Sequence, residues 1–265
     1  MRPPEITGKQ TPPAGRAFEL DALRGLALLM MILHHLIFDL RYLFNQDVFA
    51  FQEQKWFIYL LRPVFLAVFI IVSGISSTFS RSNTRRGLRL AAVAVGLTIA
   101  SLILTALTPV DFYILFNVLH VLAVGILLYA LLTAGERRDG RTRPWIDVVL
   151  LLLSAALFWL ATLLPLWPED WISVWTLPFG LLPEALRGSA DYLPLLPWLA
   201  VFLIGVVIGR VAYGGRGTAL PGAPDWLPGL TRPLQWLGRH SLIVYILHQP
   251  VLLAILFALA AVGLL

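Results

Sequence analysis

The chain has 265 residues, of which 58% are hydrophobic and only 13% are charged. A soluble domain contains roughly 45–50% apolar and about 25% charged residues, so this composition indicates an integral membrane protein. The net charge of +5 does not indicate nucleic-acid binding, because the cations lie in short clusters between apolar runs. Those runs are continuous and helix-length, which argues against the alternating pattern of a transmembrane β-barrel. Cysteine is absent, which excludes disulfides and thiolate chemistry.

The apolar runs predict the domain organisation. Residues 1–17 form a polar, Pro-rich stretch that is typical of a disordered cytoplasmic tail, with no cleavable signal peptide evident. Residues 18–265 are predicted to form a single transmembrane domain. Its predicted spans are 20–43, 56–79, 88–107, 112–132, 145–164, 195–213 and 241 to the end. The expected fold is therefore an all-α helical bundle of about seven transmembrane helices in a lipid bilayer.

The distribution of cations predicts the orientation, because Lys and Arg are enriched on the cytoplasmic side of membrane proteins. Four groups of four cations fall on one side of the predicted bundle, out of 20 Lys and Arg in total. The opposite side holds Arg41, Lys55, Arg62 and Arg187. We therefore expect a multi-pass protein of the cell (cytoplasmic) membrane, with its amino terminus in the cytoplasm and its carboxyl terminus outside.

Polar residues interrupt the first span along a single stripe. Arg24 and His35 are eleven residues apart and return to nearly the same face at about 100° per residue, and Asp39 follows His35 by one turn. Charged groups at membrane depth usually face a bundle interior or a water-filled cavity. We predict that His35 is catalytic and that Asp39 orients it and stabilises its imidazolium form. The alternative is a buried His–Asp pair that only locks helices together.

Two later spans carry further candidate residues. His120 lies in the fourth span with Asn117 three residues before it, and the last span carries a polar stripe that includes Tyr245 and His248, with Gln249 beside it. We predict catalytic roles for the two histidines and substrate binding for the other three. Zinc also takes imidazole and carboxylate ligands, but here they would come from unrelated spans, so we expect no metal.

The cytoplasmic end of the second span is small and hydroxylic, and a cluster of arginines follows it. These residues could form a pocket for the phosphates of a cytosolic donor. The alternative is close helix packing through small residues combined with the usual cytoplasmic bias of cations. The candidate donor-binding residues are Arg24, Ser73, Ser76, Ser77, Arg81, Arg85 and Arg86.

The long outer connection carries tryptophans at a regular spacing, at Trp167, Trp171 and Trp175. One interpretation is an aromatic belt at the membrane interface. The other is a surface on which a sugar stacks, for which Trp171 and Trp175 are the candidate residues.

Several stretches resemble one family of membrane proteins. The first two spans carry the most specific likeness, in RAFELDALRGLALLMMILHHLIFDL and FLAVFIIVSGISSTFSRSNTRRGLRL. Three later stretches are also similar, namely FNVLHVLAVGILLYALL, DYLPLLPWLAVFLIGVVIG and WLGRHSLIVYILHQPVLL. The family is that of bacterial membrane proteins grouped with the heparan-alpha-glucosaminide N-acetyltransferase catalytic domain. The start LDALRG is also similar to the wider superfamily of transmembrane acyltransferases.

The resemblance implies transmembrane acetyl transfer. Acetyl-CoA would bind as co-substrate from the cytoplasmic side, and an amino sugar or other sugar would accept the acetyl group at the outer face. The lysosomal enzyme that gives the family its name has an asparagine at the position of His35, and its catalytic histidine lies in the outer segment after the first span. The role of that histidine is therefore not carried over to His35. Bacterial members lack its luminal domain, so heparan is not the expected substrate.

Two other classes of function remain open. A transporter or flippase could move a polar molecule past the same stripe, although the chain lacks an inverted repeat with matching broken helices. A structural or accessory subunit would leave the stripe without a role. A homo-oligomer is also left open.

Overall fold

The structure is a computed structural model that describes residues 17–108, 113–186, 189, 191–214, 217–224 and 226–265. The described residues form helices and no strands, so the all-α prediction is confirmed. The tail over residues 1–16 lies outside the described residues. The α-helices are α1 (Phe18–Phe38), α2 (Arg62–Thr78), α3 (Asn83–Leu107), α4 (Val118–Leu132), α5 (Ala134–Asp139), α6 (Pro144–Leu163), α7 (Leu195–Ile208), α8 (Trp226–Leu230), α9 (Arg232–Arg239) and α10 (Ser241–Ala261).

Three π-helical turns extend the long helices. The first, Asp39–Leu43, continues α1, the second, Phe57–Leu61, precedes α2, and the third, Gly209–Tyr213, continues α7. With these extensions, six helices in the described part of the chain are long and apolar enough to cross a membrane. They correspond to six of the seven predicted spans.

The remaining predicted span is shorter than the sequence indicates. It was expected to begin at residue 112, but α4 begins at Val118 and has 15 residues, or about 22 Å at 1.5 Å per residue. The segment before it is covered by the connection between α6 and α7, where the Leu193 N–H donates to the Phe116 carbonyl (2.9 Å). Irregular backbone is tolerated at membrane depth when protein covers it in this way.

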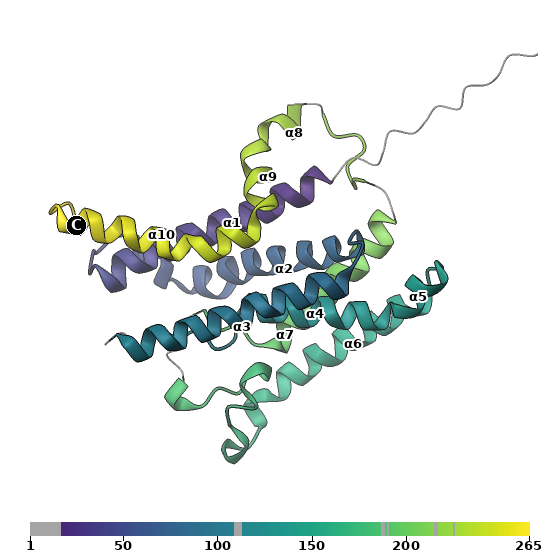
Figure 1. The fold of residues 1–265 in the computed structure, drawn as a ribbon, viewed down its shortest axis with the longest axis horizontal. Helices are drawn as coiled ribbons and strands as arrows, with labels where there is room; N and C mark the ends of the chain where they lie inside the picture. The colour runs from purple at the N-terminus through teal and green to yellow at the C-terminus, as the bar shows by residue number, and fades with distance from the viewer. Residues whose placement is uncertain (1–16, 109–112, 187–188, 190, 215–216, 225) are drawn as a thin grey trace, which may run out of the picture.

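Helix α7 lies at the centre of the bundle and packs against α2, α4 and α6 (Figure 1). Glycines bring α2 and α7 together: a Cβ on Gly74 would lie 2.3 Å from the Phe202 carbonyl oxygen, and one on Gly205 would lie 2.4 Å from the Ile71 carbonyl oxygen. Small residues permit such close approach of helices in membranes. The small residues at the end of the second span therefore permit close helix packing, which is one of the two interpretations given for this stretch from the sequence.

The short helix α9 crosses the start of α1 at one end of the bundle (Figure 1). A Cβ on Gly25 would lie 1.8 Å from the Leu234 carbonyl oxygen, and one on Gly238 would lie 1.9 Å from the Asp21 carbonyl oxygen. No side chain fits at either position. This contact fixes the helix that carries Arg24 against the segment that leads into α10.

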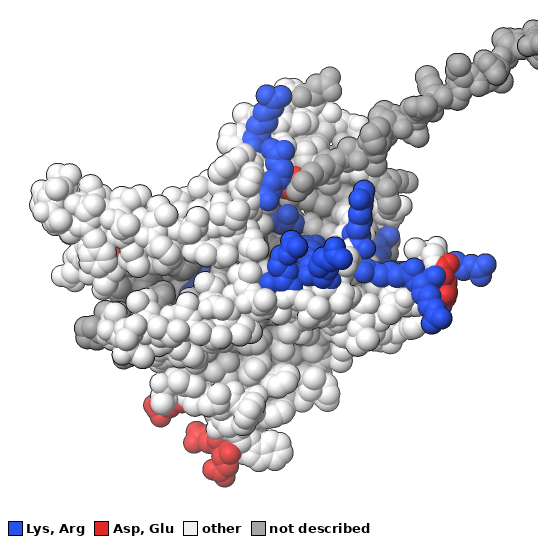
Figure 2. Space-filling view, in the orientation of Figure 1, with Lys and Arg blue, Asp and Glu red and all other residues white. Residues whose placement is uncertain are grey.

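The two ends of the bundle differ in charge. Lys and Arg side chains gather over the end where α1 begins, whereas acidic side chains appear at the opposite end, near the connection between α6 and α7 (Figure 2). Helix α10 ends at the far end from the start of α1 (Figure 1). This arrangement has the polarity that the cation count predicted, and the assignment of its ends to the two sides of a membrane stays a prediction.

Candidate functional site

Two histidines from opposite ends of the sequence meet between α1 and α10. The ring centroids of His35 and His248 are 4.9 Å apart in an edge-to-face arrangement. Nδ1 of His35 lies 2.9 Å from the Met31 carbonyl oxygen, and Nδ1 of His248 lies 2.6 Å from the Tyr245 carbonyl oxygen. The structure therefore brings together two of the three histidines that the sequence singled out.

These backbone contacts define the tautomers. A carbonyl oxygen only accepts hydrogen bonds, so a neutral His35 and a neutral His248 each carry their proton on Nδ1. The lone pair of each ring is then on Nε2. Nε2 of His248 is buried and makes no hydrogen bond with any residue that the structure describes.

Asp39 binds α10 instead of His35. Nε2 of Gln249 donates to both carboxylate oxygens of Asp39, at 2.9 and 3.0 Å. Asp39 is buried at the first residue of the π-helical turn. Among the described residues Asp39 makes no hydrogen bond with His35: Gln249 binds both of its oxygens, and Nδ1 of His35 binds the Met31 carbonyl. Asp39 and Gln249 tie α1 to α10 next to the histidine pair.

Asp191, which the sequence did not single out, also reaches this cluster. It lies in the connection before α7 at a φ of 53°, and its carboxylate accepts a hydrogen bond from the Tyr245 hydroxyl. The residue as a whole is exposed, but its carboxylate is turned towards the Tyr245 hydroxyl, and the groups around it partly exclude water. This desolvation raises the pKa of the carboxyl, while the hydrogen bond from Tyr245 and the charges of His35 and Arg62 oppose the shift. No periodicity marks a loop residue, so no sequence signal pointed to it.

A second polar region lies towards the end where α1 begins. It is a pocket of about 220 Å³ between α1, α2, α3, α4 and α10. The arginines in its lining are Arg24, Arg86 and Arg89, and the other polar side chains are Ser73, Ser241 and Tyr245. The arginines make this end of the pocket suited to an anion.

Serines of α2 position two of these arginines. The guanidinium of Arg24 donates to the Ser76 hydroxyl (2.5 Å), and that of Arg86 donates to the Ser76 carbonyl oxygen (3.3 Å). The Ser73 and Ser77 hydroxyls donate to the backbone of their own helix. Of the predicted donor-binding set, Arg24, Ser73 and Arg86 line the pocket, and Ser76 holds two of them. Ser77 is buried in the helix packing, and the exposed Arg81 and Arg85 do not line the pocket. Arg89 was missed.

Tyr245 connects the arginine pocket with the histidine pair. Its side chain lines the pocket, its ring centroid is 5.7 Å from that of His248, and its hydroxyl binds Asp191. Polar side chains therefore continue from Arg24 through Tyr245 and His248 to His35. The described residues contain no group of three or more His, Cys, Asp or Glu side chains placed to hold a metal ion.

His120 and Asn117 lie apart from this path and cap α4. The Asn117 N–H donates to Nδ1 of His120 (3.2 Å), and Oδ1 of Asn117 accepts from the Leu119 N–H (3.1 Å). This reciprocal arrangement is a capping box, which stabilises a helix start. The His120 ring also stacks on Phe116, with centroids 4.8 Å apart. The contacts around this pair are those of a helix cap.

The predicted sugar-stacking tryptophans are on the surface of the connection between α6 and α7. Trp171 and Trp175 are both exposed, and Trp171 meets Trp167 edge-to-face at 5.9 Å. The described contacts of these rings do not include the histidine pair. Their exposure fits the interpretation as an interfacial aromatic belt.

The fold and the site define a polytopic helical membrane protein with a polar path through its interior. A family model described as heparan-alpha-glucosaminide N-acetyltransferase, catalytic, matches residues 16–250. The match covers most of the chain, and the protein belongs to this family of transmembrane acetyltransferases. The resemblance identified from the sequence is thereby confirmed. Searches of curated proteins and of solved structures found no significant match.

Proposed function

We propose that this protein transfers an acetyl group from cytosolic acetyl-CoA to an amino sugar, or to another sugar acceptor, at the outer face of the cell membrane. One observation supports this proposal above the others. Tyr245 lines the arginine pocket and also contacts the cluster that contains His35, so one side chain links the pocket to the histidine pair. Membership of the acetyltransferase family supports the same reaction class.

The arginine pocket is the proposed donor site. Arg24, Arg86 and Arg89 would hold the phosphates of acetyl-CoA, because guanidinium groups form paired hydrogen bonds with phosphate oxygens. The eleven residues from Arg24 to His35 span about 16 Å along α1. An extended thioester arm that starts at the arginines and passes Tyr245 would therefore bring its acetyl group towards His35.

The histidine pair is the proposed catalytic centre. The acceptor amine attacks the thioester carbonyl, a C–N bond forms, the C–S bond breaks, and the proton of the amine passes to Nε2 of His35. The thiolate of CoA leaves and takes up a proton. His248 offers a second lone pair at Nε2, so we assign it to proton transfer instead of polarisation of the carbonyl. Asp39 and Gln249 keep α1 and α10 in register.

The orientation is part of the proposal: the amino terminus and the arginine end are cytoplasmic, and the acceptor comes from outside. The chain has no cysteine, so single cysteines can report on it. We expect a membrane-impermeant thiol reagent added to intact cells to label Ser173→Cys and to leave Ser82→Cys and Thr142→Cys unlabelled. The opposite pattern would reverse the orientation.

The direct test uses purified protein in detergent with labelled acetyl-CoA. We expect acetyl-CoA to raise the unfolding temperature and the label to appear on glucosamine in a protein-dependent manner. In proteoliposomes with donor and acceptor on opposite sides of the membrane, label should accumulate on the acceptor, and free CoA should stay on the donor side. Transport of unmodified substrate without any acetylated product would refute the proposal and favour a transporter.

A further inference from the structure

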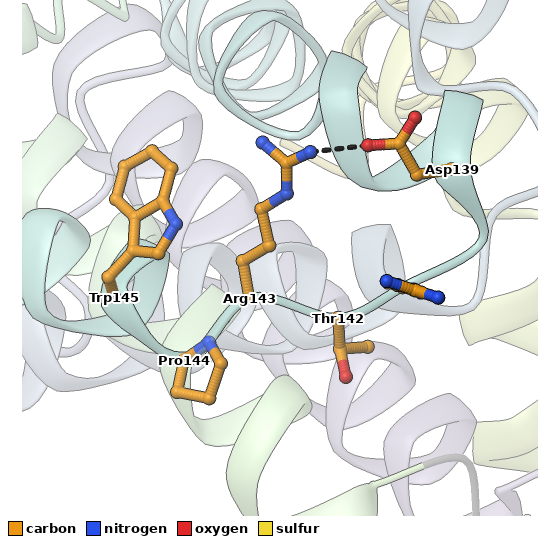
Figure 3. Close-up of a pocket in the computed structure, with 6 residues that line it drawn as sticks. Asp139, Thr142, Arg143, Pro144 and Trp145 are labelled. Carbon is orange, nitrogen blue, oxygen red and sulfur yellow. Dashed lines mark hydrogen bonds and ion pairs between the residues drawn. The ribbon is translucent and has the colours of Figure 1, made fainter.

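A second basic recess lies outside the polar path, at the turn between α5 and α6. It has a volume of about 600 Å³ and is lined by Asp139, Arg141, Thr142, Arg143, Pro144 and Trp145. Figure 3 shows Arg143 reaching towards Asp139, with the Trp145 ring on the other side of Arg143. None of these residues lines the proposed donor pocket, so acetyl transfer leaves this recess unexplained.

Hydrogen bonds and ion pairs with Glu136 and Arg210 hold this turn in place. The Arg143 N–H donates to Oε1 of Glu136 (2.5 Å), and the guanidinium of Arg210 binds both carboxylate oxygens of Glu136 (2.7 and 2.8 Å). Arg210 also forms an ion pair with Asp147 in the first turn of α6. The recess is therefore a preformed feature anchored to α7, and a ligand pays little ordering cost there.

The charge in the recess is not neutralised. The guanidinium of Arg143 is paired with Asp139. Arg141 is exposed and makes no ion pair or hydrogen bond with any residue in the described part of the chain. Arg137 and Arg138 lie in the last turn of α5, and their charges add to the positive potential. The recess thus presents an unpaired guanidinium beside the Thr142 hydroxyl, which suits a phosphate.

An apolar stripe on the outer surface of α6 leads away from this recess. Trp145, Leu152 and Trp159 follow one another at seven-residue spacing and lie nearly above one another on the helix, with Val148 between the first two. Their exposures are 56%, 66%, 63% and 56% in that order. The stripe is about 21 Å long at 1.5 Å per residue, which is long enough to lie along much of a hydrocarbon core of about 30 Å. A ligand that places an anionic group in the recess and an apolar chain along the stripe is an amphiphile.

We propose that this recess binds the phosphate of an anionic phospholipid, with an acyl chain lying along the exposed face of α6. Basic pockets at the cytoplasmic ends of membrane helices are typical sites for such head groups. Trp145 lies where tryptophan is favoured, at the boundary between head groups and chains. A phosphate-bearing soluble molecule shares the head-group chemistry but has no use for the apolar stripe.

The test is native mass spectrometry of the full chain in detergent with equal amounts of phosphatidylglycerol and phosphatidylcholine. We expect preferential retention of phosphatidylglycerol. Arg141→Gln should lower this retention about fivefold, as expected for the loss of one cation near an anionic head group. Trp145→Ala should lower the retention of both lipids. The matched control is Arg138→Gln, which removes the same charge from an exposed residue outside the recess and should change retention less than about twofold.

Three outcomes would overturn the proposal. Equal retention of the two lipids by the wild-type chain would remove the role of the anionic phosphate. Equal losses in Arg141→Gln and Arg138→Gln would assign the effect to general surface charge. Complete displacement of phosphatidylglycerol by inorganic phosphate or CoA would show that the recess serves soluble phosphates. Arg141 and Arg138 are both exposed, so both variants should elute as the wild-type protein on size exclusion.

Discussion

Two histidine-containing regions of this protein have similar side chains and different surroundings. Nδ1 of His120 accepts the Asn117 N–H and completes the cap of α4, so this ring nitrogen serves the start of a helix. His35 and His248 each bind only a backbone carbonyl through Nδ1, and Nε2 of each is left with a lone pair. Residue type and membrane depth are therefore poor guides to chemistry when the hydrogen-bond partners are unknown. The hydrogen-bond partners distinguish a histidine that caps a helix from two histidines whose Nε2 atoms are not used in such a cap.

The largest expected effect comes from removing the proposed base. His35→Ala should lower the turnover number of acetyl transfer by about 10²–10⁴-fold, the usual contribution of general acid–base catalysis. Acetyl-CoA affinity should stay close to the wild-type value, because the arginine pocket is about 16 Å away along α1. The measurement is transfer from labelled acetyl-CoA, normalised to the folded protein recovered from size exclusion.

The matched control for this variant is His120→Ala. It removes the same side chain from the capping region and should retain most of the turnover per folded molecule. Full activity in His35→Ala would end its assignment as the base. Loss of activity in His120→Ala together with normal folding would return His120 to the catalytic set.

The next effect concerns the two groups of arginines at the end of the bundle where α1 begins. Arg86→Gln and Arg24→Gln should each raise the Kd of acetyl-CoA by about tenfold or more, because each removes charge-assisted hydrogen bonds to phosphate. High salt should weaken binding to the wild-type protein. Arg81→Gln and Arg85→Gln should have a much smaller effect, since these side chains are exposed and lie outside the pocket. Isothermal titration with CoA and dephospho-CoA measures these differences, and equal losses in all four variants would contradict the pocket assignment.

A smaller effect is expected at the cap of α4. Asn117→Ala removes the oxygen that accepts the Leu119 N–H and should lower the free energy of unfolding by about 1 kcal/mol. Turnover per folded molecule should be unchanged. The unfolding temperature in detergent and the rate of acetyl transfer, measured on one preparation, separate an effect on stability from an effect on turnover. A normal unfolding temperature with reduced turnover would instead support the substrate-binding role predicted from the sequence.

The smallest effect is a pH dependence at Asp191. Desolvation of the carboxylate raises its pKa, so its ionised form is disfavoured in the folded state, and stability is lost as pH rises through the range between its ordinary and raised pKa. Asp191→Asn removes the charge, while Asn tolerates the positive φ and its amide oxygen can accept from Tyr245. The variant should unfold at a higher temperature than the wild-type protein at neutral pH. The difference should vanish near pH 3, and a pH-independent difference would rule out this cause.

Much of the candidate site was accessible from the sequence because helical periodicity relates residues within one span. Arg24, His35 and Asp39 fall on one stripe by spacing alone, and the structure places the first two in one polar path. Their partners were not accessible, because periodicity says nothing about which helices are neighbours. The partner of Asp39 is Gln249, 210 residues away. Asp191 lies in a loop and reaches Tyr245 only through the tertiary fold.

The sequence by itself determined the membrane class, the location of six long helices and the segregation of cations, because apolar run length and charge act locally. Only the tertiary structure decided that α4 starts late, that His120 is a cap and that His248 meets His35. The late start of α4 depends on the connection between α6 and α7, and the cap at His120 depends on its contact with Asn117. The meeting of His35 with His248 depends on packing between α1, α9 and α10, where Gly25 and Gly238 allow backbones to touch. Such contacts join residues more than two hundred positions apart, and no local pattern encodes them.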